Sequence, residues 1–175
     1  MATTMANTYY VKALNAYPWY LDEFLEAINY ALSYDEDHAD AHCLFGRFYM
    51  DQLYKFADAR YHFDKALAAD PHNVLTYYAY IRLCVNTGEY NKARKLMKTA
   101  DKVYGIEKTY IKHFGAIILE KEGEFKAAKA ELKSLLKEET SNWVRTYLKN
   151  ELNRVKEKMR KKSSSKKRKG KKKKK

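Results

Sequence analysis

The stretch GRFYMDQLYKFADARYHFDKALAADP, residues 46–71, decides the fold class of this chain. Within it, Ala59, Phe63 and Ala66 are spaced by four and then three positions, which places them on one face of an α-helix. Pro71 ends this helix, because proline has no amide proton to donate and its ring clashes with the preceding turn. The stretch therefore predicts an amphipathic helix whose apolar face combines small residues with one aromatic ring.

The same pattern recurs along the chain at offsets of 34 or 35 residues. Each copy has an aromatic or aliphatic residue, followed three positions later by the helical set. The four copies are Leu21, Phe24, Ile28 and Ala31; Phe56, Ala59, Phe63 and Ala66; Tyr90, Ala93, Met97 and Ala100; and Phe125, Ala128, Leu132 and Leu135. A period of this length predicts a stack of similar structural units.

A second pattern lies between these copies, again at offsets of 35 and 34 residues. Its members are His42, Phe45, Gly46 and Tyr49; Tyr77, Tyr80, Ile81 and Cys84; and Ile111, Phe114, Gly115 and Ile118. Each unit therefore contains two amphipathic helices, with breaking residues between them at 86–89 and 122–124. A single helical hairpin cannot bury its apolar face alone, so we expect the hairpins to stack.

A two-helix unit of about 34 residues, with small residues at the helix crossing and a proline after the second helix, resembles the tetratricopeptide repeat. Residues 46–71 carry the resemblance most clearly, through Gly46, Tyr49, Ala59, Phe63, Ala66, Leu67 and Pro71. It covers roughly residues 5–138, and the first helix of the first unit matches poorly. The resemblance implies an all-α fold, a right-handed superhelical stack of helix-turn-helix units.

The expected organisation has three parts. About four helix pairs, the first degenerate, occupy residues 5–138, and a capping helix follows over residues 141–160. The cap is indicated by a helical stripe made of Trp143, Val144, Tyr147, Leu148, Leu152 and Val155. Residues 161–175 contain no apolar side chain that could offset their ordering entropy, so they predict a disordered lysine-rich tail.

Charge is concentrated at the C-terminal end. The formal net charge is +13, yet 12 basic and no acidic residues lie between Arg160 and Lys175. The preceding residues hold 23 basic and 22 acidic side chains and are close to neutral. The basicity therefore characterises the tail, and the tail and the body are expected to bind different partners.

Several function classes receive no support from the sequence. It has no phosphate-binding glycine loop, nucleophile elbow or zincin-type helix, so we expect no catalytic activity and no cofactor. His38 and His42 lie near Cys43, but His42 occupies a packing position, so we expect no metal site. His62 and His113 have no evident partners. Charged residues such as Glu120 are interpreted as a solvated helix face.

The sequence also favours a cytoplasmic location. It has no run of 18 apolar residues and no signal-peptide pattern at its N-terminal end, so neither a transmembrane helix nor export is expected. Cys43 and Cys84 lack a metal or redox spacing and are interpreted as free thiols in a reducing compartment. In a eukaryote, the lysine run would also act as a nuclear import signal.

The resemblance further implies that the first helix of each unit lines a concave groove. Transferred position by position, the groove residues are Cys43, Arg47, Tyr78, Arg82, Lys112 and Ala116. Arg47, Tyr78, Arg82 and Lys112 would suit an acidic peptide or a C-terminal carboxylate, since arginine pairs with carboxylates at two points. The alternative is that these cations only form ion pairs with Asp40, Asp51 or Glu120.

The tail is a second candidate site. Its cations are Lys161, Lys162, Lys166, Lys167, Arg168, Lys169, Lys171, Lys172, Lys173, Lys174 and Lys175. RNA or the ribosome, an anionic membrane surface and an acidic protein are possible partners, and a purely solubilising tail is the alternative. The hypothesis is a cytoplasmic scaffold that binds a protein in its groove and a polyanion through its tail. The rival hypothesis is a nonspecific nucleic-acid-binding protein that uses body and tail together.

Overall fold

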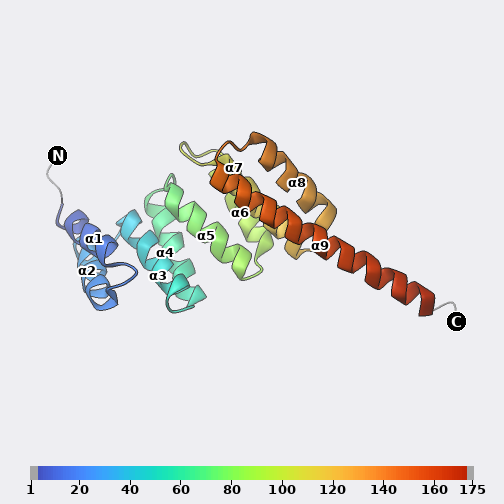
Figure 1. Ribbon diagram of the computed structural model, residues 1–175. Coiled ribbons are helices and arrows are strands. Elements are labelled where there is room, and N and C mark those ends of the chain that lie inside the picture. The colour runs from blue at the N-terminus through green and yellow to red at the C-terminus, as the bar shows by residue number, and fades with distance from the viewer. Residues whose placement is uncertain (1–3, 173–175) are drawn as a thin grey trace. The chain divides into compact units, whose positions relative to one another are not determined.

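The computed structural model describes the backbone of residues 4–172 and the side chains up to residue 162; residues 1–3 and 173–175 lie outside the described residues. This part of the chain contains nine α-helices and no strand (Figure 1), which confirms the all-α prediction. It divides into two compact units, Met1–Ile106 and Glu107–Lys175, which we call unit 1 and unit 2. Among the described helices, none is long and apolar enough to cross a membrane.

Unit 1 consists of three antiparallel helix pairs. They are α1 (Met5–Ala16) with α2 (Leu21–Tyr34), α3 (Ala39–Asp51) with α4 (Phe56–Ala69), and α5 (Val74–Asn86) with α6 (Tyr90–Ala100). Helix α3 packs against both α1 and α2, and α5 packs in the same way against α3 and α4. The expected stacking of hairpins is therefore present within unit 1, while the right-handed superhelix stays a prediction.

The repeated small residues lie where the helices cross. Ala59, Phe63 and Ala66 are fully buried in the second hairpin, and Ala93 and Ala100 take the equivalent places in the third. Gly46 faces this set, because a Cβ atom added there would lie 2.6 Å from the Phe63 ring. A glycine at position 46 thus allows α3 to approach α4 closely, and the aromatic ring fills the remaining space.

The helix ends follow the local chemistry of the sequence. The Asn73 side chain caps α5 by accepting a hydrogen bond from the Thr76 amide, at 2.9 Å. His38 caps α3 in the same way, through its Nδ1 atom and the Ala41 amide. Gly88, in the turn before α6, has a φ of 80°, a left-handed conformation that glycine adopts without strain.

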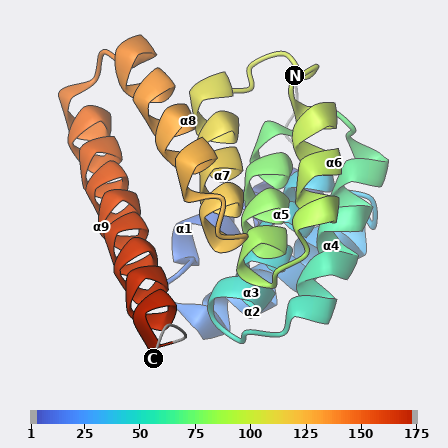
Figure 2. The same cartoon turned by 90° about the vertical axis from the view of Figure 1, so that its right-hand side faces the viewer.

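Unit 2 contains α7 (Lys108–Lys121), α8 (Phe125–Glu138) and α9 (Asn142–Lys172). Helix α8 packs against both of its neighbours, and α9 runs beside it (Figure 2). The core combines the repeat positions on α8 with one face of α9; its fully buried members include Ala128, Leu132, Leu135, Leu148 and Val155.

The expected capping stripe was wrong at two positions. Trp143 is 78% exposed and Tyr147 is 43% exposed, whereas Leu148 and Val155 are buried. Each of the two aromatic residues lies one position before a residue of the buried face, which turns it about 100° around the helix and away from the core.

Helix α9 does not end at the expected residue 160. It continues to Lys172, and Lys162 holds it to the turn before α8. The Lys162 ammonium donates to the Gly123 carbonyl at 3.1 Å and lies 5.1 Å from the centre of the Phe125 ring. Lysine is a good helix former, so the composition of this segment is compatible with a longer helix. Disorder of the free tail stays a prediction, and its side chains from residue 163 lie outside the described residues.

Candidate functional site

In unit 1, the first helices of the three pairs bring arginine and tyrosine side chains together. The Arg47 guanidinium on α3 lies 5.4 Å from the centre of the Tyr17 ring at the end of α1. Arg82 on α5 donates to the Asp51 carboxylate at 2.8 Å, and both charges act on the Tyr17 hydroxyl. We call Tyr10, Tyr17, Arg47, Asp51 and Arg82 the arginine–tyrosine cluster.

Arg47 is the cation of this cluster that remains available to pair with an added anion. It is half-buried, and among the described residues its side chain has no ion-pair partner. Arg82 instead forms an ion pair with Asp51, one of the partners considered in the alternative interpretation. A guanidinium has five N–H donors in a planar fork, so Arg47 can pair with an added carboxylate at two points.

The two tyrosines of the cluster keep their protons. Burial raises the pKa of Tyr10, and the Asp40 carboxylate raises it further. Burial and the Asp51 carboxylate likewise raise the pKa of Tyr17, against a smaller opposing effect of Arg47. Both phenols therefore stay neutral and can donate a hydrogen bond to an anion beside Arg47.

The remaining expected groove residues are distributed differently. Tyr78 is half-buried on α5, one helical turn before Arg82. Lys112 belongs to unit 2, where it is exposed and donates to the Glu138 carboxylate at 3.1 Å. Cys43 and Ala116 are buried, so these two positions serve packing. The expected basic column is therefore represented in unit 1 by Arg47 and Arg82.

Sequence reasoning missed Tyr10 and Tyr17, whereas Asp51 was considered there as an ion-pair partner of the groove cations. The first helix matches the repeat poorly, so no groove position was transferred to it. Tyr10 lies on α1 and Tyr17 is the residue that directly follows it, with an extended backbone, so helical spacing carries no signal that joins them.

One histidine has a partner that the sequence did not predict. His42 Nε2 donates to the Glu36 carbonyl at 2.9 Å, so the Nδ1 atom of neutral His42 is an acceptor. It accepts from His62 Nδ1, 2.9 Å away. Burial lowers the pKa of both rings, and the neighbouring His42 helps to lower that of His62 to about 4. Within the described part of the chain, no three potential ligands gather as a metal site.

The interpretation of Glu120 as part of a solvated face was wrong. Its carboxylate is buried and accepts hydrogen bonds from Arg154, at 3.0 Å for Nε, and from Lys158, at 2.7 Å. Burial by itself would raise the pKa of Glu120, but the hydrogen bonds from these cations lower it below its ordinary value. The carboxylate thus joins α7 to α9 and is structural.

Comparison with known proteins agrees with this architecture. Residues 53–104, which span the second half of one hairpin and the whole of the next, match the family model described as tetratricopeptide repeat. No curated protein and no solved structure matches the chain significantly. Together with the stacked helix pairs, the match over this part of the chain supports a tetratricopeptide repeat protein. Repeats of this family generally mediate protein–protein interaction on a non-enzymatic scaffold.

Proposed function

We propose that the chain is a non-catalytic adaptor that binds a carboxylate of a partner protein at the arginine–tyrosine cluster. The observation that carries this proposal is the half-buried Arg47, which has no carboxylate partner among the described residues. Half-buried cations are usually paired, so an open guanidinium on the first-helix face favours an anionic ligand.

The surroundings of Arg47 suit an acidic side chain or a C-terminal carboxylate. The Tyr17 ring supports the guanidinium, and the phenols of Tyr10 and Tyr17 are neutral donors nearby. The Arg82–Asp51 pair lies beside them and limits the number of negative charges that the cluster can accept. A charge-assisted hydrogen bond contributes about 1.5–3 kcal/mol, so loss of Arg47 should weaken binding at least tenfold.

The test is a library of immobilised peptides that end in acidic residues, each with a free or an amidated C-terminus. Binding of the full chain is compared with that of Arg47→Ala, Arg47→Lys and the control Arg60→Ala. Arg60 lies on α4 and is paired with Glu89, outside the cluster. We expect Arg47→Ala to lose the peptides, Arg47→Lys to keep part of the affinity and Arg60→Ala to bind normally. Equal binding by Arg47→Ala and the native chain would refute the proposal.

The lysine-rich tail gives the adaptor a second binding device, for RNA or another polyanion. The 12 basic residues from Arg160 onward, with no acidic residue among them, support this part of the proposal. Contacts between lysine and phosphate release counterions and are independent of base sequence. The near-neutral body favours binding through the tail alone over the rival hypothesis, in which body and tail bind nucleic acid together. The cytoplasmic location stays a prediction.

Filter binding to a nonspecific RNA tests the tail. We compare the native chain with a variant in which every lysine and arginine of residues 161–175 is replaced by glutamine. Binding should be lost in the variant and should fall steeply with added salt in the native chain. An equal affinity of the two chains would exclude the tail as the polyanion site.

A further inference from the structure

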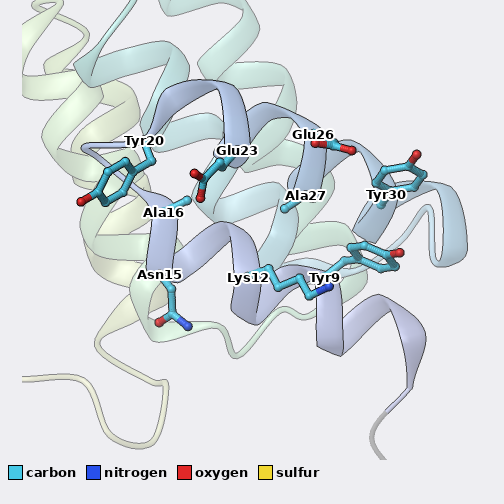
Figure 3. A pocket seen from close by; sticks show the side chains of 9 residues that line it. All are labelled: Tyr9, Lys12, Asn15, Ala16, Tyr20, Glu23, Glu26, Ala27 and Tyr30. Carbon is cyan, nitrogen blue, oxygen red and sulfur yellow. The ribbon is translucent and has the colours of Figure 1, made fainter.

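A separate surface of unit 1 lies between α1 and α2. It is an open groove of about 660 Å³, and its walls carry Tyr9, Lys12, Tyr20, Glu23, Glu26 and Tyr30. We call it the α1–α2 groove. Figure 3 shows Tyr20 near one end and Tyr9 and Tyr30 near the other, with two alanines between them. A groove of this size can hold several side chains of a bound segment.

The helical spacing of α2 separates the groove from the core. Glu23, Glu26 and Tyr30 lie three and four positions apart, which places them on one face of the helix. Phe24 and Ile28 lie on another face and are buried in the core that α1 and α2 form with α3. The face that carries the two carboxylates is therefore distinct from the face that holds the hairpin to α3.

The aromatic wall of the groove already contacts an ammonium group. The Nζ atom of the exposed Lys12 lies 4.9 Å from the centre of the Tyr9 ring, within the range of a cation–π interaction. Tyr30 stacks on Tyr9 with 4.9 Å between the ring centres. The stacked rings therefore form a platform that attracts cations.

The acidic wall points to the same kind of ligand. Glu23 and Glu26 are exposed, and among the side chains that the structure describes neither has an ion-pair partner. The residues that line the groove include these two carboxylates and one cation, Lys12, so their net charge is negative. This preference for a cation is opposite in sign to that of the arginine–tyrosine cluster, so the two sites need different ligands.

The floor of the groove is apolar. It contains Ala16 and Ala27, which are buried at 4% and 7% exposure. A lysine side chain combines a four-carbon stem, which packs on apolar surface, with an ammonium group that stays in polar surroundings. Such a stem can lie on the two alanines while its ammonium group reaches a carboxylate or a tyrosine ring. An apolar side chain would use only the floor, and an anionic one would be repelled by the acidic wall.

We propose that the α1–α2 groove binds a lysine-rich segment of a partner protein. Charge complementarity carries this choice of ligand, since the groove offers two open carboxylates, a tyrosine platform and an apolar floor for the lysine stems. Unit 1 would then present two surfaces, one for an acidic and one for a basic partner segment. The inference is independent of Arg47 and would survive a failure of the carboxylate site.

The test measures fluorescence anisotropy of a short dye-labelled peptide of alternating lysine and glycine. The receptor is the full chain at roughly 50 mM salt, a concentration at which screening is weak. Glu23→Gln with Glu26→Gln should weaken peptide binding about fivefold, because two exposed ion pairs are lost. The control Asp101→Asn with Glu157→Gln makes the same change of charge at exposed positions elsewhere and should leave the affinity unchanged.

A second peptide tests the class of ligand. Acetylation of every lysine keeps the stems and removes the charges, so the acetylated peptide should bind at least fivefold more weakly than the lysine peptide. Undetectable binding of the lysine peptide, or equal binding to the Glu23→Gln/Glu26→Gln variant, would overturn the site. Equal affinity for the acetylated peptide would overturn the assignment of a lysine-rich ligand, because the floor alone would then account for binding.

Lys12 allows a test of the aromatic wall that a loss of folding cannot imitate. Lys12→Met removes the ammonium group from the Tyr9 ring and should raise the affinity for the lysine peptide about threefold. Lys95→Met, at an exposed position on α6, makes the same change of charge and should have little effect. An unchanged or lowered affinity in Lys12→Met would overturn the tyrosine platform as part of the site.

Discussion

Acidification should destabilise unit 1 through the buried His42–His62 pair. In the folded chain, His62 has a pKa of about 4, lowered from 6.5 by its burial and by His42. Unfolding exposes the ring to water and restores the ordinary value. The unfolded chain therefore binds a proton at His62 that the folded chain does not bind, and this difference acts between pH 6.5 and pH 4.

The lowered pKa of His62 determines the sign and the size of the change in stability with pH. Because the folded pKa is lowered, the contribution of His62 is fully present above pH 6.5 and is lost as the pH falls towards 4. Each pKa unit corresponds to about 1.4 kcal/mol. Between pH 7 and pH 4.5, the free energy of unfolding should therefore fall by about 2.5 kcal/mol on account of His62 alone.

Urea denaturation at pH 7 and pH 4.5 measures this quantity in the native chain and in His62→Phe. Phenylalanine keeps an aromatic ring against Tyr49, on which His62 stacks, but it cannot be protonated. The fall in stability between the two pH values should be about 2.5 kcal/mol smaller in His62→Phe. The exposed His72→Gln serves as the control and should behave as the native chain. An unchanged pH dependence in His62→Phe would refute the reasoning.

Three further predictions concern packing. Phe63→Ala should cost about 3–5 kcal/mol in urea denaturation, because the ring is fully buried and its loss leaves a cavity; a cost below about 1 kcal/mol would contradict the packing. Gly46→Ala should cost about 1–3 kcal/mol, and adding Phe63→Leu should recover part of this loss; additive costs would show that the two residues do not meet. Glu120→Gln should lower the free energy of unfolding by about 1–3 kcal/mol, a modest loss because Arg154 and Lys158 are half exposed and partly hydrated. The substitution should also speed proteolysis within α9. An unchanged rate of proteolysis would contradict the contact of Glu120 with these two cations.

The repeat could be predicted from the sequence because its period determines burial directly. Ala59, Phe63 and Ala66 are buried as their spacing predicts. The copies on α6 and α8 are buried as well, except that Met97 is half-buried. The expectation for Trp143 was wrong because the apolar face of one helix, taken alone, does not show which positions are buried. Trp143 is turned about 100° around the helix from the residues that pack in the core. The face of α9 that is buried depends on its contacts with α8, which have no local signal.

The candidate site was predictable in part. Arg47 could be selected through the family resemblance, because its place in the repeat defines the face on which it lies. Its lack of a carboxylate partner could not be predicted, since pairing depends on which side chains meet across separate helices. Glu120 shows the same limit, because its partner Arg154 is 34 residues away along the chain. The His42–His62 contact likewise joins residues 20 apart on two helices.

The most direct test of the central claim is to locate an acidic ligand on the chain by NMR. A hexaglutamate peptide with a free C-terminus is titrated into the full-length 15N-labelled protein, and amide shifts are mapped by residue. The largest shifts are expected around Tyr17, directly after α1, and around Arg47 on α3 and Arg82 on α5, and they should vanish in Arg47→Ala. Shifts confined to the lysine-rich end of α9, or unaltered by Arg47→Ala, would contradict the assignment of the arginine–tyrosine cluster as the partner site.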